Sequence, residues 1–363
     1  MMRKNFSGII LSAALLAASF CGFSAVAGAE EAEGTRILVD ANGREVTLNE
    51  TIERAVVSNR YNLEIIRAVG AIDQVVSIDK LAYTNEAFWP EFTEEQVYGN
   101  GTRDLDYEKI ISYNPDVFIV LPGQYKDEIA EKLGEYDIPV FVLKCSSGQT
   151  VEEYNAQITL CAELFGKEEG AERVIDFCSS VRTEVENRLA DMPEEERVRV
   201  YLEYYDLYTT CFGNESGWGQ MIYQAGGYNV IDSTMQVEDS DYADAEAVIN
   251  SNPDVIIKTV YRDGKDSIFQ DNYLPPTEED YAYALDEMKN REGFSLMDAV
   301  ENDQIVMCSD FCLRGGGNTV GLAFFAKWLH PDRFEDYDTY AVFDQWMTEF
   351  QNMEKIDGHV YGN

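Results

Sequence analysis

Arginine and aromatic residues recur where the chain is expected to leave a buried strand, and these side chains have a clear chemical use. Arginine binds carboxylates, phosphates and other oxyanions through two parallel N–H groups. Aromatic rings provide walls that grip a flat or bulky ligand. In open parallel sheets, ligands bind beyond the carboxyl ends of the strands. We therefore predict a ligand-binding site formed by Arg60, Tyr61, Tyr83, Trp89, Tyr125, Tyr204, Trp218, Tyr261, Arg262 and Arg314.

Each of these residues also has an ordinary structural use. The chain contains 22 Tyr and 18 Phe, so many aromatic rings must belong to the core. An arginine in a chain with 67 acidic residues commonly pairs with a surface carboxylate. The glycines 315 to 317 follow Arg314 and free backbone N–H groups near the site, but glycine-rich turns also occur for purely geometric reasons.

Catalytic motifs are missing from the sequence. It has no Gly-x-Ser-x-Gly, no GxGxxG after a strand and no phosphate-binding loop that ends in Gly-Lys-Ser/Thr. Cys145 and Cys211 have no histidine near them in sequence, and carboxylate pairs are too common here to indicate an acid–base site. We expect no catalytic residues and no enzyme activity. An exported enzyme that acts on a polysaccharide is kept as an alternative.

A bare transition metal does not fit the ligand chemistry of the chain. His330 and His359 are its two histidines, and both lie near the C-terminus, outside the expected site. Zinc or manganese would require clustered histidines and carboxylates, and haem bound through an axial histidine fails for the same reason. A tyrosine ligand to haem stays open. We predict no metal ligands and no cofactor, and any metal would arrive within a chelate that brings its own ligands.

The chain repeats itself at an offset of 138 residues. The segments 106–119 and 244–257 are identical at eight of 14 positions, including Glu, Asn-Pro-Asp-Val and Ile. Asp106 and Asp244 stand where they cap a helix, and Glu108 and Glu246 occupy its first turn, where the helix dipole favours a negative charge. A proline then ends the helix, and an apolar run of the parallel-sheet type begins a buried strand.

Further segments echo each other around this repeat. Residues 61–70 resemble residues 218–227 as a short helix closed by glycine, so Tyr61 and Trp218 occupy equivalent positions. A strand follows each copy, at 138–143 and at 304–309. Helices are expected at 151–165 and 167–192, and the second is long enough to link two lobes. The fold class is α/β, with two similar parallel-sheet lobes, a long connecting α-helix and a ligand cleft between the lobes.

These patterns set the domain boundaries. Residues 1–29 have the features of a signal peptide, because Arg3 and Lys4 precede an uncharged run that ends in Ala27-Gly28-Ala29. An uncleaved anchor is the alternative, and Phe20 argues against lipid attachment at Cys21. Residues 36–148 form an N-terminal lobe, residues 150–192 the connecting helices, and residues 197–355 a C-terminal lobe with terminal helices. We expect an exported protein, periplasmic or otherwise extracytoplasmic.

Charge and cysteine content restrict the partners. The 28 Lys and Arg residues against 67 Asp and Glu give a formal net charge of −39, which argues against nucleic acid and against direct binding of anionic lipid. Without Cys21, six cysteines are left, and sequence cannot choose among disulfide pairings or free thiols. They are Cys145, Cys161, Cys178, Cys211, Cys308 and Cys312.

Taken together, the export signal, the two lobes and the connecting helix resemble the ABC-transporter solute-binding proteins for ferric siderophores, haem and cobalamin. Residues 39–48 resemble that family's opening β-hairpin, and residues 299–306 and 322–331 resemble its C-terminal strand and helix. In that family, a glutamate on each lobe docks onto arginines of the permease. The resemblance assigns permease docking to Glu108 and Glu246, although helix capping alone explains their placement.

The resemblance implies capture of a small-molecule metal chelate and its delivery to ABC-transporter permease subunits. We expect a ferric siderophore first, a corrinoid second, and haem or an oxyanion such as molybdate as further alternatives. A ligand-sensing protein on the same fold is the alternative of another class. A monomer suits the carrier mechanism.

Overall fold

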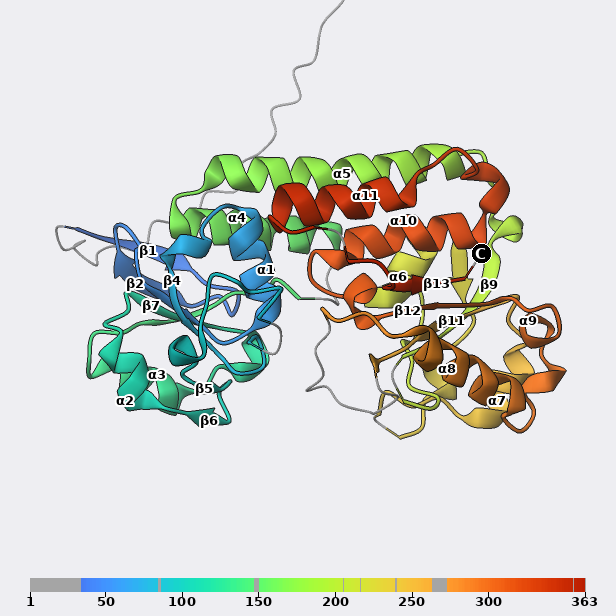
Figure 1. Cartoon of the computed structure of the whole chain (residues 1–363), viewed down its shortest axis with the longest axis horizontal. Helices are drawn as coiled ribbons and strands as arrows, with labels where there is room; N and C mark the ends of the chain where they lie inside the picture. Colours follow the sequence, from blue (N-terminus) through green and yellow to red (C-terminus); the bar gives the residue numbers. More distant parts are fainter. Residues whose placement is uncertain are drawn as a thin grey trace, which may run out of the picture.

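The computed structural model describes residues 34–362 except 84–85, 147–149, 205, 216, 239, 263–272 and 355. The expected signal peptide and Cys21 therefore lie outside the described residues. Two α/β lobes stand side by side under a layer of long helices (Figure 1). Among the described helices, none combines the length and apolar character needed to cross a bilayer.

The first lobe is built on a four-stranded parallel sheet in the order β4-β3-β7-β8. An antiparallel hairpin, β1 and β2, precedes it, and a small hairpin, β5 and β6, lies at its edge. The strands are β1 Thr35–Val39, β2 Glu45–Asn49, β3 Ala55–Val57, β4 Val75–Ile78, β5 Gly99–Asn100, β6 Asp104–Leu105, β7 Val117–Val120 and β8 Val140–Val142. The helices of this lobe are α1 Arg60–Ala68, α2 Tyr107–Ser112 and α3 Asp127–Gly134.

The second lobe has a five-stranded sheet in the order β10-β9-β11-β12-β13. Its strands are parallel except β13, which pairs antiparallel with β12. They are β9 Val198–Glu203, β10 Gly227–Asn229, β11 Val255–Thr259, β12 Ile305–Cys308 and β13 Val360–Tyr361. The helices are α6 Gly217–Gln224, α7 Ala245–Ser251, α8 Glu278–Asn290, α9 Asp298–Glu301, α10 Gly317–Leu329 and α11 Thr339–Gln345. The sheet thus continues beyond residue 355, because the chain returns after the terminal helices to add β13.

The predicted repeat is present as two equivalent helix-to-strand units. Asp106 caps α2 by accepting a hydrogen bond from Lys109 N at 2.9 Å, and Asp244 caps α7 by accepting one from Ala247 N at 2.9 Å. Each helix leads into the central strand of its sheet, β7 or β11. The match between the two copies therefore reflects the same local physics in both lobes.

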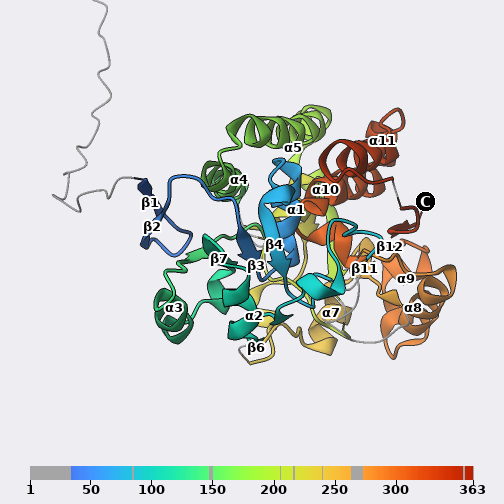
Figure 2. The ribbon, with the colours of Figure 1, turned by 60° about the vertical axis from the view of Figure 1, so that its left-hand side comes forward.

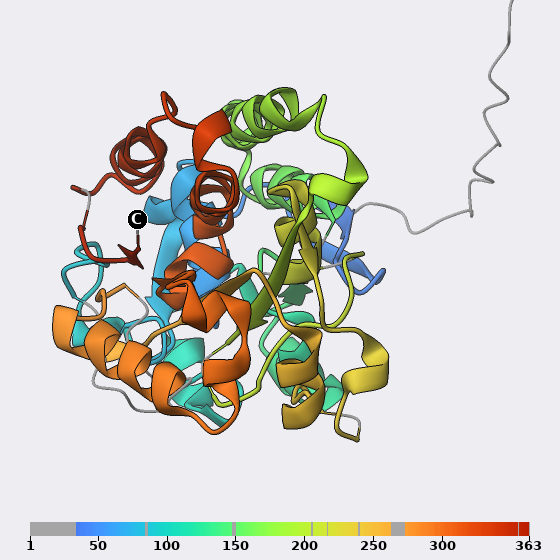
Figure 3. The ribbon, with the colours of Figure 1, turned by 90° about the vertical axis from the view of Figure 1, so that its right-hand side faces the viewer.

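Two helices connect the lobes. Helix α4 spans Val151–Phe165, the bounds predicted from sequence, and α5 spans Glu168–Leu189. Gly166 ends α4 in the left-handed region at φ +66°. Helix α5 packs on α1 of the first lobe and on α6 and α10 of the second, and Figure 3 shows α10 between α5 and α11. One continuous core cluster consequently joins both lobes through these helices.

Candidate functional site

A cavity of about 180 Å³ lies between the lobes, at the carboxyl ends of their strands. Its walls come from the residues that follow β3, β4 and β7 in the first lobe and β9, β11 and β12 in the second. The lining residues are Ser58, Asn59, Arg60, Tyr61, Asp79, Leu81, Gln124, Tyr204, Tyr261, Asp310 and Arg314. The strand-end rule used for the sequence therefore locates this cavity.

The first-lobe wall is fixed by the start of α1. Asn59 leaves β3 with extended backbone and caps the helix, because its Oδ1 accepts a hydrogen bond from Tyr61 N at 2.9 Å. Ser58 Oγ donates to Gln124 Oε1 at 2.8 Å, and the same oxygen accepts from Leu121 N at 3.0 Å. These bonds hold Ser58, Asn59 and Gln124 around the N-terminus of a helix, where the dipole favours a negative charge.

The second-lobe wall is a hydrogen-bonded network around Asp310. Tyr261 Oη donates to Tyr204 Oη at 3.0 Å, and Tyr204 Oη donates to Asp310 Oδ1. Arg314 Nε donates to Asp310 Oδ1 at 2.8 Å, and its Nη2 donates to Tyr204 Oη at 2.6 Å. Trp218 lies behind this layer, with its ring 4.4 Å from that of Tyr204 and its Nε1 donating to Leu313 O at 3.1 Å.

Arg60 brings the two walls together. Its Nη2 donates to Tyr61 Oη at 3.0 Å and lies 3.9 Å from Asp310 Oδ2 of the other lobe. Its Nε is buried and has no hydrogen-bond partner among the described residues. Burial alone lowers the pKa of Arg60, but Tyr61, Tyr273 and Asp310 outweigh it, so the pKa is raised and the guanidinium stays charged.

The charged groups that line the cavity are Arg60, Arg314, Asp310 and Asp79, so positive charge is in excess when Asp79 is protonated. Burial lowers the pKa of Arg314 in the same way, but the neighbouring Asp310 outweighs it, so the cavity holds two permanent cations. Burial raises the pKa of Asp79 to about 7, and this carboxyl is therefore largely protonated below neutral pH. Burial also raises the pKa of Tyr61, Tyr204 and Tyr261, which keeps their hydroxyls neutral and able to donate.

Five of the ten predicted binding residues line this cavity: Arg60, Tyr61, Tyr204, Tyr261 and Arg314. Trp218 contacts two of them from behind, because its ring also lies 5.1 Å from the Arg314 guanidinium. The predicted equivalence of Tyr61 and Trp218 is thus correct in position, but only Tyr61 reaches the cavity. Six further lining residues are not among the ten predicted ones, although all of them follow strand ends, which is the signal that could have found them: Ser58, Asn59, Asp79, Leu81, Gln124 and Asp310.

The other four predicted residues do not line the cavity. Trp89 is 0% exposed and packs in the core, where its ring lies against those of Phe92 and Tyr273. Tyr83 lies half-buried against that same core, and Tyr125 lies under the Arg44 guanidinium, 3.8 Å from ring to Cζ. Arg262 is half-buried and outside the lining. These four side chains therefore do not reach the lining of this cavity, since a position beside a strand end does not fix the side-chain direction.

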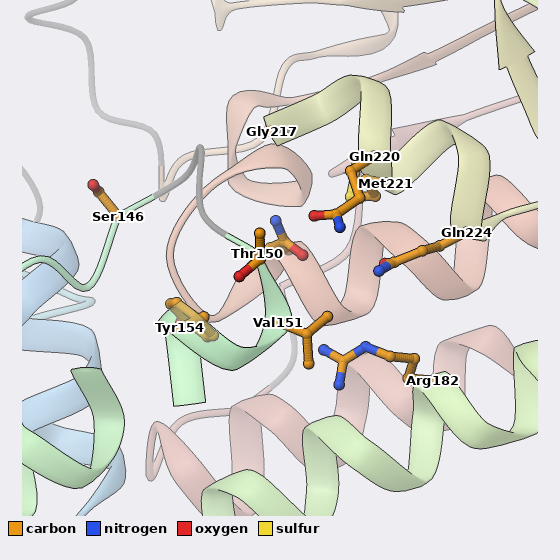
Figure 4. Close-up of a pocket in the computed structure, with 10 residues that line it drawn as sticks. Ser146, Thr150, Val151, Tyr154, Arg182, Gly217, Gln220, Met221 and Gln224 are labelled. Atoms are coloured by element: carbon orange, nitrogen blue, oxygen red, sulfur yellow. The ribbon is translucent and has the colours of Figure 1, made fainter. Parts of the chain in front are cut away.

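Two other hollows differ from the cavity in size and setting. Figure 4 shows a small pocket at the junction of α4, α5 and α6, lined by polar residues that include Thr150, Arg182 and Gln220. Its volume of about 30 Å³ holds little more than a water molecule. A shallow surface hollow of about 740 Å³ lies beside Glu108 and contains Lys80, Lys109 and Lys132. The first is too small for a ligand of several heavy atoms, and the second is lined by the first lobe alone.

The two histidines and the six cysteines after Cys21 all lie within the described residues. His330 Nε2 donates to Gly226 O, and His359 is buried beside Ser309, so both histidines lie away from the cavity. Within the described part of the chain, no group of three or more His, Cys, Asp or Glu side chains is arranged to hold a metal ion. All six cysteines after Cys21 are free thiols. Burial raises the pKa of Cys211 to about 12, which makes this thiol unreactive.

Glu108 and Glu246 are both exposed in the first turns of α2 and α7. Figure 1 places α2 and α7 on the lower edge of the molecule, one on each lobe and opposite α5, and Figure 2 keeps both helices on that edge. The helices that carry the two glutamates therefore lie on the same edge of the molecule.

Comparison with known proteins decides the family. A family model described as a periplasmic binding protein matches residues 55–310. The chain belongs to the periplasmic binding protein family. It is an extracytoplasmic solute-binding protein of the ABC-transporter type, as the resemblance in the sequence implied.

Relatives within this family cover most of the chain. The molybdate-binding protein MolA of Haemophilus influenzae is 24% identical over 87% of this chain and 90% of its own length. An ABC-transporter substrate-binding lipoprotein of Bacillus subtilis, YvrC, is 23% identical over 82% of this chain and 86% of its own length. The TroA-like periplasmic binding protein FepB of Veillonella parvula superposes with a TM-score of 0.68 at 21% identity, covering 90% of this chain and 99% of that one. The periplasmic binding protein thus has the TroA-like, two-lobed fold.

Proposed function

We propose that this periplasmic binding protein captures a small tetrahedral oxyanion, of which molybdate is the leading example, and delivers it to an ABC-transporter permease. The observation that carries the proposal is the cavity itself: about 180 Å³, partly open between the lobes and lined by two arginines and three tyrosines. Pockets for drug-sized ligands occupy roughly 300–1,000 Å³. The cavity is therefore suited to a ligand of a few heavy atoms.

The donors in the cavity match the needs of an oxyanion. Guanidinium groups form charge-assisted hydrogen bonds with oxyanions, and Arg60 Nε is a buried donor with no partner among the described residues. The N-terminus of α1 adds a favourable dipole. MolA, whose name states that it binds molybdate, supports the same ligand class.

A ferric siderophore, the ligand favoured from the sequence, becomes the second candidate. Tyr61, Tyr204 and Tyr261 provide aromatic contacts for such a chelate, but the cavity volume lies below the range for a ligand of that size. Corrinoids and haem also exceed the volume of this cavity. The family and its relatives are binding proteins, which favours a carrier over a polysaccharide enzyme or a sensor.

Delivery requires a permease, and Glu108 and Glu246 are the proposed docking residues. They carry like charges at equivalent places on the two lobes, as a two-fold partner requires. The carrier is proposed to act as a monomer, because one chain supplies both lobes and both walls of the cavity.

Calorimetric titration of the purified protein tests the ligand. Molybdate and tungstate are expected to bind with micromolar affinity or tighter and without chemical change, while ferric siderophores, cobalamin and haem bind more weakly or not at all. Sulfate and phosphate measure selectivity among oxyanions. Tight binding of a ferric chelate with no response to molybdate or tungstate would overturn the oxyanion assignment and restore the second candidate.

A further inference from the structure

A buried carboxylate joins the two lobes directly behind the cavity. Glu64 lies on α1, one turn after Arg60, and only 3% of its surface is exposed. Both of its carboxylate oxygens accept hydrogen bonds from the second lobe. Tyr273 Oη donates to Oε1 at 2.6 Å, and Gly316 N donates to Oε2 at 3.1 Å. Since Glu64 does not line the cavity, ligand contact does not explain these bonds.

Tyr273 is anchored in the first lobe by its ring as well. The ring stacks on Phe88 at a centroid distance of 3.7 Å and meets Trp89 edge-on at 5.6 Å. The Arg67 guanidinium covers the other side of Trp89 at 4.0 Å. Phe88 and Trp89 therefore form a socket for a second-lobe tyrosine, which gives a physical reason for the burial of Trp89.

The glycines after Arg314 shape the other contact. Gly315 adopts φ +54°, and a Cβ atom at this residue would lie 2.4 Å from Glu64 Oε2. A side chain here would push the carboxylate away from Gly316 N. The glycine run thus allows Glu64 to approach the backbone immediately beyond Arg314.

We propose that Glu64 is a positioning residue of the oxyanion cavity: it fastens α1, which carries Arg60 and Tyr61, to the turn that follows Arg314 and to Tyr273. This inference rests on the proposed function. The two cavity arginines come from different lobes, so their separation depends on how α1 is held against the second lobe. Glu64 is the side chain of α1 that forms hydrogen bonds to both second-lobe segments next to the cavity.

Protonation of Glu64 adds a distinctive readout. Burial raises its pKa to about 7, opposed by the hydrogen bonds from Tyr273 and Gly316 and by the charges of Arg60 and Arg67. The other titratable groups that interact with it are Cys145 and Tyr154, whose pKa values burial raises, so both are neutral. An anion in the cavity disfavours the ionised form of Glu64, so binding takes up protons and affinity falls as pH rises through about 7. Asp79, whose pKa is also about 7, contributes in the same direction.

The experiment measures molybdate affinity by calorimetry at about pH 6 and about pH 8 in wild type and variants. Glu64→Ala is expected to weaken binding about tenfold or more, the loss typical of one to two hydrogen bonds. Tyr273→Phe removes only the hydroxyl that donates to Glu64, keeps the ring in its socket and should weaken binding several-fold. This second variant tests the same contact if Glu64→Ala fails to fold. Glu64→Gln retains an acceptor for Gly316 N, so at about pH 6 it should bind molybdate more tightly than Glu64→Ala does. Its affinity should also change less between the two pH values than that of wild type. A residual dependence from Asp79 is expected.

Glu91→Gln is the matched control. Glu91 Oε2 accepts a hydrogen bond at 2.6 Å from Arg67, which lies on α1 together with Glu64. This ion pair lies wholly within the first lobe. Glu91→Gln should keep a pH dependence of the wild-type size, because the Glu64 carboxylate stays in place. Its midpoint should fall slightly, since Arg67 loses its partner and acts more strongly on Glu64. Unchanged affinity in both Glu64→Ala and Tyr273→Phe, or a Glu64→Gln variant with the wild-type pH dependence, would overturn the positioning role.

Hydrogen exchange separates this inference from the proposed function. The Gly316 amide should exchange faster in Glu64→Ala than in wild type or Glu91→Gln, with no ligand present. If wild type does not bind molybdate but the Gly316 amide exchanges faster in Glu64→Ala, the ligand assignment is wrong and the inter-lobe contact is supported. If molybdate binds but Gly316 exchange is unchanged, the contact made by Glu64 is wrong.

Discussion

Arg60 combines a buried guanidinium with an unpartnered Nε at the junction of the two lobes, which makes it the residue whose loss should matter most for an anionic ligand. A hydrogen bond to a charged group contributes about 1.5–3 kcal/mol, so Arg60→Ala should weaken oxyanion binding roughly ten- to hundredfold. Arg173→Ala removes the same charge from the exposed surface of α5 and should leave affinity unchanged. Calorimetric titration of both variants with the oxyanion measures these affinities. If Arg60→Ala and Arg173→Ala lose equal affinity, the effect comes from overall charge and not from contact with the ligand.

Glu203 forms a buried ion-pair cluster in the second lobe, beside the cavity wall. It lies 3.0 Å from Lys258 Nζ, and Arg291 Nη2 donates to it at 2.9 Å. Burial alone raises the pKa of this carboxyl, but Lys258 and Arg291 outweigh it and lower the pKa from 4.5 to about 2. A depressed pKa contributes stability that is present above about pH 4.5 and is lost as pH falls towards 2.

Glu203→Gln should therefore lower the free energy of unfolding by about 3–5 kcal/mol at neutral pH, because Lys258 loses its buried counter-charge and Arg291 keeps only the more exposed Glu287. The loss relative to wild type should shrink below about pH 4.5. Denaturant unfolding at neutral and acidic pH measures both effects. A constant difference across that range would contradict the ion-pair explanation.

At the scale of helices, Gly170 shows why packing can override propensity. Alanine is favoured over glycine inside a helix by about 1 kcal/mol. A Cβ atom at Gly170 of α5 would nevertheless lie 2.0 Å from Val69 O, at the end of α1. Gly170→Ala should lower the free energy of unfolding by about 1–3 kcal/mol. Gly134→Ala at the end of α3 is the control, since no atom lies within 4 Å of a Cβ there. Thermal denaturation should show no loss of stability for this variant.

Elements with strong local signals were predictable from the sequence. Thr150 and Glu153 form a capping box and Gly166 ends the helix, so α4 has the predicted bounds. The two-residue strand β13 escaped prediction, because so short a segment has no periodicity and depends on pairing with β12. Side-chain direction was the other limit: Gln124 lines the cavity, whereas its neighbour Tyr125 lies against Arg44. Such choices depend on tertiary contacts that no local pattern contains.

At the scale of the whole molecule, the position of α2 and α7 on one edge determines what a permease can contact. Replacing Glu108 and Glu246 together by lysine reverses both charges without changing any residue that lines the cavity. Uptake by cells that contain the permease should be abolished, while oxyanion affinity in solution stays at the wild-type value. Each single variant should show an intermediate loss, because one lobe still docks.

A matched double variant isolates position from charge. Glu152 and Glu168 are also exposed in the first turns of their helices, α4 and α5, but these helices form the edge opposite α2 and α7 (Figure 1). Glu152→Lys with Glu168→Lys changes the net charge equally and should leave uptake intact. If this control loses uptake as well, overall acidity rather than docking governs delivery. If the Glu108 and Glu246 variant retains uptake, the permease contacts another face, and the repeat-encoded carboxylates serve only to stabilise their helices.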